Sequence, residues 1–385
     1  MMRTAGELDS VTPLLARARD VARTAARHAV DADQERRLRP DVVREVVDAG
    51  FARHFVPTRY GGAAAGFTEL LDAVAIVGRA CAATAWVASL GATVARMAVH
   101  LPEEGQRELW ADGPDTLLVG ALMPVGRAEK VPGGWRLSGK WSYISAVDFS
   151  QWALLCAMAP ADGHNGDGSP QARYFAVPRA TYTVLDTWFS VGMRGTGSNT
   201  LVLDGAYVPE HLSFARAQVL DGAGSTSPAT CHRVPLRAVN GLSFVTPVLG
   251  AARGMLSEWT RWNAAKAATG TGGSAADDVA FRDVLARTAG EVDAAELLLR
   301  RAAAVADEGV FTDLLTARGA RDCSLASETL LTAVNRMFRA MGTSGQTSGS
   351  PFERHWRDVN SATSHIVLRF DTAAESYARQ VLAGG

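Results

Sequence analysis

The sequence feature that most constrains the fold is a stretch of β character, residues 133–209, between two blocks rich in Ala, Leu and Arg. Within it, aromatic and β-branched residues recur at short intervals broken by turn residues, as in Trp152–Met158 and Arg173–Val177. In the flanking blocks, apolar residues recur at three- and four-residue steps. The sequence therefore predicts an α+β fold that is mostly α, with a small β domain between two helical domains.

This pattern divides the chain into four parts. We expect an N-terminal helical domain over residues 1–114, a central β domain over 115–215, a connecting loop over 216–240 and a C-terminal four-helix bundle over 241–385. His232 in the connecting loop is expected to be solvated. Long segments with one apolar face, separated by short Gly-containing breaks, are typical of an antiparallel bundle. The bundle helices are predicted at Leu242–Lys266, Ala275–Asp307, Phe311–Met341 and Pro351–Leu382.

Charge and cysteine content exclude several classes of function. The 39 Lys and Arg residues are balanced by 40 Asp and Glu residues, whereas a nucleic-acid-binding protein would carry a basic excess. The four cysteines lie far apart, so we expect neither a disulfide framework nor a metal site. No apolar run approaches membrane-spanning length and the N-terminus lacks a signal-peptide core, so we expect a cytoplasmic protein that does not bind membranes.

A Gly-rich loop, Gly192–Thr200, is the first candidate binding element. It combines Gly residues, hydroxyls and one guanidinium, which together suit an anionic group held by backbone N–H, Ser/Thr and Arg donors. A phosphate is the expected guest. Taken alone, such a loop between two strands is more often a simple turn than a phosphate site.

The order of elements and several local strings resemble the acyl-CoA dehydrogenase superfamily. The resemblance covers nearly the whole chain, and it implies helical, β and four-helix-bundle domains with a flavin between the last two. It also implies a homotetramer built on the bundles. The strings that carry the resemblance are Gly134-Trp135, Gly139-Lys140, Tyr143-Ile144-Ser145, Gly192-Met193-Arg194-Gly195-Thr196 and the closing segment Asp204–Pro209.

One position separates this chain from the dehydrogenases of that superfamily. Many of them carry a catalytic glutamate just before the Gly-Thr of the last bundle region, where it removes a substrate proton. Met341 stands before Gly342 and Thr343 here, and a thioether cannot act as a base. Glu258 on the first bundle helix is only a loose substitute. An FAD-containing acyl-CoA dehydrogenase therefore stays the alternative interpretation, followed by a flavin-fold binding protein without catalysis.

The C-terminal region resembles another branch, the two-component flavin-dependent monooxygenases. The run Pro351–Trp356 is followed by His365 nine residues after the tryptophan, as in that branch. The branch implies reduced FMN or FAD from a separate flavin reductase, and molecular oxygen that adds to the flavin as a C4a-hydroperoxide. No segment resembles a nicotinamide-binding unit, which is consistent with a separate reductase.

The resemblance predicts an oxygenase component that hydroxylates an aromatic or phenolic compound, or oxidises an amine-bearing small molecule. The bias towards Ala, Arg and Gly is typical of a GC-rich bacterial genome. A tailoring step in natural-product biosynthesis, for example of an antibiotic, would suit such an enzyme by association with its relatives.

The resemblance also assigns roles to individual residues. His365 is the expected base, because an imidazole with a pKa near neutrality suits deprotonation of a phenol or amine. His355 is expected to face another side of the same helix, because ten residues at 100° leave the two histidines about 80° apart. Ser145 is the expected hydroxyl facing the flavin, although an ordinary strand serine explains it equally well. No residue is predicted to bind a metal.

The remaining predicted residues bind the flavin or shape the pocket. Trp188 would cover the isoalloxazine ring, and Arg357 could instead pair with Glu353 or Asp358. The predicted flavin-binding residues are Trp141, Trp188, Arg194, Thr196, Ser198, Arg354 and Arg357, of which Arg194, Thr196 and Ser198 are assigned to the phosphate. The predicted substrate-pocket residues are Leu90, Thr93, Met97, Phe244 and Val245.

Overall fold

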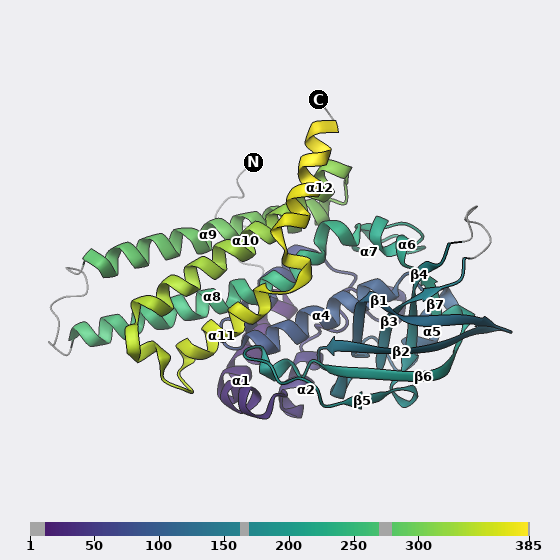
Figure 1. Ribbon diagram of the computed structural model, residues 1–385, viewed down its shortest axis with the longest axis horizontal. Helices are drawn as coiled ribbons and strands as arrows, with labels where there is room; N and C mark the ends of the chain where they lie inside the picture. Colours follow the sequence, from purple (N-terminus) through teal and green to yellow (C-terminus); the bar gives the residue numbers. More distant parts are fainter. Residues whose placement is uncertain (1–11, 162–168, 269–278, 384–385) are drawn as a thin grey trace.

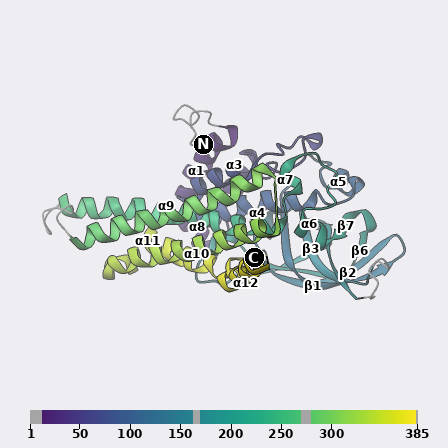
Figure 2. The same cartoon turned by 90° about the horizontal axis from the view of Figure 1, so that it is seen from above.

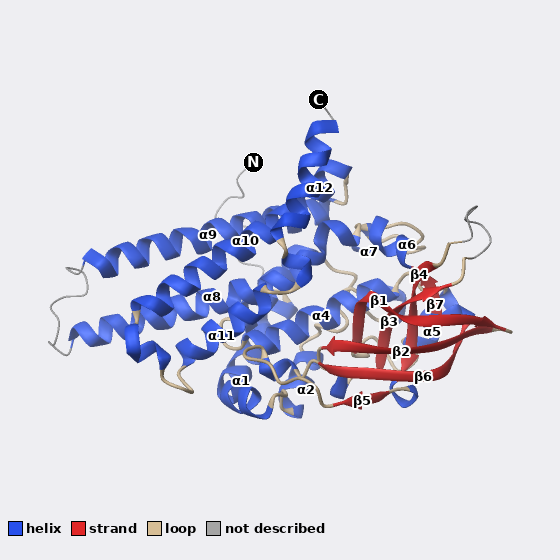
Figure 3. Cartoon of the chain, in the orientation of Figure 1, coloured by secondary structure: helices blue, strands red, loops and turns tan. Residues whose placement is uncertain are grey.

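The structure is a computed structural model that describes residues 12–161, 169–268 and 279–383. Strands gather at one end of the elongated molecule, and long helices extend from the other end (Figures 1 and 3). This arrangement confirms the predicted α+β, mostly α fold class. The helices before the sheet are α1 (Pro13–Glu35), α2 (Pro40–Asp48), α3 (Phe67–Gly78), α4 (Ala82–Ala98) and α5 (Glu103–Leu109).

Helix α4 occupies the centre of the molecule. It is built mainly from small residues and is buried along almost its whole length, from Ala82 to Ala98. It contacts α3 and α8 on its helical side and β1 on its sheet side. Small side chains allow the close approach on both sides, so α4 becomes a wall shared by the sheet and the bundle.

The sheet has the strand order β5-β6-β2-β1-β3-β4-β7, with antiparallel pairs except for the parallel β1–β3 pair. The first long strand was not anticipated, because the predicted β stretch began only at residue 133. The Gly-rich segment Gly192–Ser198 is a loop, as predicted, and β6 begins directly after it at Asn199. The strands are β1 (Leu118–Val131), β2 (Gly134–Ile144), β3 (Trp152–Ala159), β4 (Gln171–Pro178), β5 (Thr183–Leu185), β6 (Asn199–Pro209) and β7 (Ser213–Ala215).

The segment between the sheet and the bundle is partly helical rather than a plain loop. His232 lies in it and is fully buried, which corrects the prediction that this residue is solvated. Its Nδ1 lies 2.6 Å from Ser227 Oγ and its Nε2 lies 2.5 Å from the Phe55 carbonyl oxygen. The histidine therefore ties this segment to the N-terminal helices. The segment contains α6 (Arg216–Asp221) and α7 (Thr230–Arg233).

The C-terminal helices pack lengthwise against one another, and α12 stands out from the body with the C-terminus at its tip (Figure 1). The predicted last helix, Pro351–Leu382, is broken after Thr363 by a short 3₁₀ turn. His365 caps this turn and so lies between two helices, not inside one. The bundle helices are α8 (Leu236–Ala268), α9 (Val279–Glu308), α10 (Asp313–Ala340), α11 (Pro351–Thr363) and α12 (Phe370–Ala383).

The loop before β6 is pressed onto α11. A Cβ atom added to Gly192 would lie 2.1 Å from the Arg357 carbonyl oxygen, so only glycine allows this approach. Residue Met193, next in the loop, has a left-handed conformation with φ of 54°. The loop thus connects the sheet to the bundle at this point. Figure 2 shows the bundle helices α8, α9, α10 and α11 extending away from the strands. The short 3₁₀ turns are η1 (Thr58–Tyr60), η2 (Val147–Phe149), η3 (Arg179–Thr181), η4 (Arg194–Thr196), η5 (Glu210–Leu212), η6 (Gly342–Gln346) and η7 (Ile366–Leu368).

Two features are absent from the described residues, a membrane-spanning helix and a cluster of metal ligands. No helix within residues 12–161, 169–268 or 279–383 has the length and apolar character needed to cross a membrane. Over the same residues, no three His, Cys, Asp or Glu side chains come together as metal ligands would.

Candidate active site

The largest apolar cavity, of about 790 Å³, lies where the sheet meets the bundle. Its walls come from α4, β1, β2, the loop of residues 188–198, α8 and the α11–η7 joint. Most of the lining is apolar or aromatic, and the cations Lys140 and Arg216 also reach it. None of the described lining residues is Asp or Glu. The cavity therefore suits a flat, electron-rich guest and offers no carboxylate base.

His365 lies in this cavity in a fixed orientation. Its ring stacks on Phe244, with centroids 3.9 Å apart, and meets Trp86 edge-on at 5.8 Å. Burial lowers the pKa of His365 to about 4, so the ring is neutral near pH 7. Its Nδ1 accepts a hydrogen bond from the Val367 N–H at 3.3 Å, so the neutral ring carries its hydrogen on Nε2. His365 is thus prepared to donate a hydrogen bond into the cavity.

Ser145 also lines the cavity and ends a chain of hydroxyl groups. Thr196 Oγ1 donates to the Met193 carbonyl oxygen at 2.8 Å, so its one hydrogen is used. Ser198 must therefore donate to Thr196, and Ser145 must donate to Ser198, across contacts of 2.7 and 2.8 Å. Trp86 Nε1 donates to Ser145 Oγ at 3.1 Å. Ser145 is left with acceptor capacity only, which suits an N–H group of a bound ligand.

The backbone of Met193 connects this hydroxyl chain to Trp188 and to the bundle. The Met193 N–H donates to Asp358 Oδ1 at 2.6 Å, and its carbonyl oxygen also accepts from Trp188 Nε1 at 3.1 Å. Asp358 is buried, and this burial raises the pKa of its carboxyl to about 6. A buried acid of α11 therefore fixes the loop that carries Trp188 in the cavity wall.

Trp141 and Trp188 reach the cavity in different ways. Trp141 of β2 is fully buried and donates from Nε1 to the Cys156 carbonyl oxygen at 2.8 Å. It lines the cavity from the side of the sheet. Trp188 is only partly buried, and its ring meets the exposed ring of Tyr143 edge-on at 6.1 Å. A ring bound in the cavity would therefore meet Trp188 at its entrance.

The predicted arginines lie outside the lining of the cavity. Arg194 donates from Nε to the Asp33 carbonyl oxygen at 2.8 Å, so it points towards α1. Arg357 binds the Asp33 carboxylate through NH1 and NH2 at 2.9 and 2.8 Å. It also pairs with Glu353, which was one of the alternatives predicted for this residue. These ion pairs raise the pKa of Arg357 further above its usual value. Arg354 lies on the same helix and does not line the cavity either.

Four of the five predicted substrate-pocket residues line the cavity. Leu90, Thr93 and Met97 follow one another along α4, and Phe244 faces them from α8. Val245 does not reach it, since its side chain is fully buried in the helical core. The reason is geometric, because neighbouring residues of a helix point about 100° apart.

The two positions considered for a dehydrogenase base are elsewhere. Met341 is the C-cap of α10 and belongs to the bundle core. Glu258 lies in α8 with its carboxylate 3.7 Å from His355, and burial raises its pKa. His355 is buried beside it and does not line the cavity, although the helical spacing used to separate it from His365 does not apply, because His365 lies outside α11. No described carboxylate occupies the place of a catalytic glutamate in the cavity wall.

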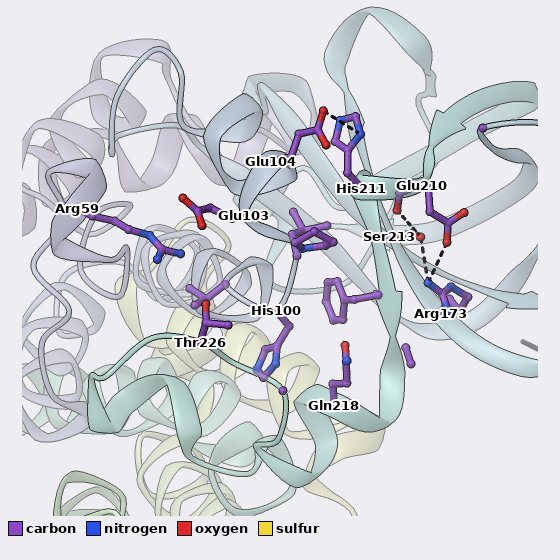
Figure 4. A pocket seen from close by; sticks show the side chains of 17 residues that line it. Arg59, His100, Glu103, Glu104, Arg173, Glu210, His211, Ser213, Gln218 and Thr226 are labelled. Carbon is purple, nitrogen blue, oxygen red and sulfur yellow. Dashed lines mark hydrogen bonds and ion pairs between the residues drawn. The ribbon is translucent and has the colours of Figure 1, made fainter. Parts of the chain in front are cut away.

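A second cavity of about 810 Å³ lies by the β4–β7 edge of the sheet, next to α5 (Figure 4). Several of its charged side chains already have charged partners. His211 lies 2.8 Å from Glu108 and 3.8 Å from Glu104, and Arg173 lies 3.8 Å from Glu210. This cavity has no flat apolar slot, so we assign the chemistry to the cavity that contains His365.

The residues of the first cavity fit a flavin. Its volume lies within the range of small-molecule sites, and its aromatic walls suit a flat ring system. Trp188, Trp141, Ser145 and His365 would contact the ring and its edge. The hydroxyls of Ser198 and Thr196 stand behind Ser145 and hold it in place.

Family comparison agrees with this fold and site. The N-terminal domain model of the acyl-CoA dehydrogenases matches residues 12–113, and the corresponding C-terminal domain model matches residues 242–370. The chain belongs to the acyl-CoA dehydrogenase superfamily, in the branch of oxygenase components of flavin-dependent monooxygenases.

Three relatives illustrate this membership. The oxygenase component of the FADH2-dependent resorcinol hydroxylase of Rhizobium sp. is 32% identical, with 94% of this chain and 91% of that protein covered. The structure of XiaF from Streptomyces sp. with FADH2 and glycerol has a TM-score of 0.88 at 27% identity, with 96% and 97% covered. The 3-HSA hydroxylase structure from Rhodococcus sp. RHA1 has the same fold, with a TM-score of 0.91 at 24% identity and 97% of each chain covered.

Sequence reasoning missed three residues of the site. Trp86 holds Ser145 and contacts His365, but it was not singled out because it lies among alanines in an apolar helix. Asp358 anchors Met193 from α11, and Asp33 receives Arg357. Asp358 follows Arg357 in the string that carried the resemblance, which was the one signal that could have marked it.

Proposed function

We propose that this protein hydroxylates a phenol-type aromatic compound, using reduced flavin and dioxygen. The observation that carries the proposal is that the cavity between sheet and bundle contains the imidazole of His365 and no described carboxylate. An acyl-CoA dehydrogenase needs a carboxylate in this cavity to remove a proton from a carbon atom of its substrate. The cations Lys140 and Arg216 favour a phenolate over an ammonium group, so an amine is the less suitable substrate.

His365 acts on the substrate oxygen in this proposal. The substrate binds as the phenolate, with its proton released to solvent before binding. With Nδ1 occupied by the Val367 N–H, the neutral ring donates its Nε2–H to the phenolate oxygen and stabilises its negative charge. A phenolate carries more electron density on its ring carbons, which favours attack by an electrophilic oxygen. This geometry favours a donor role over the base that the sequence predicted.

The other residues of the cavity orient the bound groups. Reduced FMN or FAD, when bound, supplies two electrons and activates dioxygen for the transfer of one oxygen atom. Ser145 accepts a hydrogen bond from an N–H group at the flavin edge, because its own hydrogen is used by Ser198. The apolar side chains of Leu90, Met97 and Phe244 hold the aromatic ring and exclude water.

The proposal includes partners and a setting. A separate flavin reductase supplies the reduced cofactor, and a homotetramer built on the bundles completes the assembly. The cytoplasm suits the four cysteines, which are all buried and free. A tailoring step in natural-product biosynthesis is the proposed context.

The direct test supplies chemically reduced FMN or FAD, ¹⁸O-labelled dioxygen and resorcinol to the full-length protein. We expect a hydroxylated product that carries one ¹⁸O atom, detected by mass spectrometry. Tightly bound FAD in the purified protein that is bleached by an acyl-CoA would instead establish the dehydrogenase. Hydrogen peroxide as the sole product from a panel of phenols would overturn the proposed substrate class.

A further inference from the structure

Arg96 of α4 has no part in the chemistry described above, yet it is a buried cation with no ion pair to a described residue, and its guanidinium lies 5.4 Å from the centre of the Phe67 ring. It is 1% exposed. Its NH1 donates to the carbonyl oxygens of Cys231 and Val234 at 3.1 and 2.9 Å. Its Nε and NH2 have no hydrogen-bond partner among the described residues. These two nitrogens carry N–H groups that only donate, so they need an acceptor.

No described group neutralises this charge. No described carboxylate lies within ion-pair distance of Arg96, and burial is what lowers its pKa to about 10, so it stays protonated near neutral pH. The thiol of Cys231 is close, but burial raises its pKa to about 11 and it remains uncharged. A buried cation without a counter-ion is strongly unfavourable, and an anion that reached it would recover much of this cost.

Arg96 lines a small void that adjoins the main cavity. The void of about 20 Å³ lies between α3, α4 and α8, and apart from Arg96 its polar lining consists of hydroxyl groups. Thr93 lines both the void and the main cavity. Its Oγ1 donates to the Ser89 carbonyl oxygen at 2.9 Å, so Ser243 Oγ donates to Thr93 at 2.8 Å. This pair of hydroxyls is the partition between the two spaces.

We propose that Arg96 is the receptor for a carboxylate carried by the aromatic substrate. Arg96 follows Thr93 by one helical turn, so a group passing Thr93 from the main cavity meets the guanidinium. The void alone has room for about one water molecule, so binding requires the Thr93 and Ser243 hydroxyls to turn aside. The ring of such a substrate lies against Leu90 and Phe244. This inference rests on the proposed function for the position of the ring.

The test compares an acid with its neutral isostere. Binding of 3-hydroxyphenylacetate and 3-hydroxyphenylacetamide to the full-length protein is measured by titration calorimetry. The wild-type protein is expected to bind the acid about tenfold or more tightly than the amide, because a desolvated charge pair forms. Arg96→Met, which keeps the apolar stem, is expected to lose most of this preference. Arg216→Met tests the competing cation in the main cavity wall. Arg59→Met is the matched control, because Arg59 lines only the second cavity, and the preference should persist in it.

Several results would overturn the inference. Equal binding of acid and amide by the wild-type protein would do so without any variant. Loss of the preference in Arg216→Met but not in Arg96→Met would move the receptor to Arg216. Acetate that binds at Arg96 without competing with the amide would show a free small anion rather than the substrate. If Arg96→Met does not fold, Thr93→Leu blocks the passage, and retained preference in that variant excludes the route.

This test is separate from that of the proposed function. Oxygen transfer to neutral phenols such as resorcinol needs no anion receptor. Failure of the acid–amide comparison with retained hydroxylation removes only the role of Arg96. Failure of hydroxylation with a retained acid preference removes only the proposed reaction.

Discussion

His365 is the residue whose replacement should separate oxygen activation from oxygen transfer. We expect His365→Ala to lower the yield of hydroxylated product per reduced flavin by about a hundredfold, since the donor to the substrate oxygen is lost. Oxygen consumption should continue and end in hydrogen peroxide. His365→Gln, which keeps an N–H donor, should recover part of the yield. Product and peroxide are quantified together in single-turnover reactions with resorcinol.

The control for this prediction is His211→Ala. His211 lies in the second cavity beside Glu108, and its removal should leave the ratio of product to peroxide unchanged. An unaltered ratio in His365→Ala would contradict the assigned role. Thermal unfolding of each variant identifies any loss that comes from misfolding.

At the scale of single residues, the sequence indicated which residues lie in the cavity, but not which of their hydrogen bonds they donate and which they accept. The motif located His365, but its tautomer depends on the N–H of Val367 in a 3₁₀ turn that no local signal predicted. Ser145 was located as well, whereas its role as acceptor follows from a chain of hydroxyls through Ser198 and Thr196. Such chains depend on three-dimensional neighbours, which spacing along the sequence does not give.

The loop that carries Trp188 depends on one residue of another element, Asp358 of α11. We expect Asp358→Ala to destabilise the protein by about 1–3 kcal/mol, because the buried Met193 N–H loses its acceptor. Trp188 fluorescence should then shift towards that of a solvated indole. Asp358→Asn keeps an acceptor oxygen and should retain the native fluorescence.

The same residue gives a pH dependence whose sign can be stated. Burial raises the folded-state pKa of Asp358 to about 6, so its stability contribution is present at low pH and is lost as pH rises through 6. Asp358→Asn should therefore be at least as stable as the wild type near pH 8. This advantage should shrink as pH falls below about 6 and disappear near pH 4. A variant that is less stable than the wild type only near pH 8 would contradict this account.

The elements that the sequence missed have two different physical causes. Strand β1 contains Gly120, Pro124 and Gly126, which resemble a loop, and its register with β3 shifts between Ala121 and Gly126. Gly126 is required there because an added Cβ would lie 2.1 Å from the Trp141 ring. The break between α11 and α12 has the opposite character, since no Gly or Pro marks it. Long helices with clear periodicity were located within a few residues at most ends.

Across the whole molecule, buried histidines make the fold sensitive to acid. Burial is the first cause that lowers the pKa of each, to about 4 for His100 and His365 and to about 3 for His355. A depressed histidine pKa means that the unfolded chain binds more protons, so stability is lost as pH falls from about 6.5 towards 4. His54 and His232 shift in the same direction.

We therefore expect the free energy of unfolding to fall below about pH 6, by up to roughly 1.4 kcal/mol per pH unit for each of these histidines. The melting temperature should fall with it. Circular dichroism melts between about pH 8 and pH 4.5 measure it. His355→Phe, which fills the buried site with an uncharged ring, should reduce the steepness. A melting temperature that stays constant down to about pH 5 would contradict the prediction.

An oxygenase that receives its cofactor from solution must admit and release it in each catalytic cycle. The contact of Gly192 with the Arg357 carbonyl oxygen leaves no space for a ligand between the loop and α11 at that point. We therefore expect the flavin to enter and leave at the rim of the cavity, where the lining residues Met123, Val125 and Tyr143 are exposed. The tight contact at Gly192 and the exposed rim thus together determine from which side a flavin can reach the cavity.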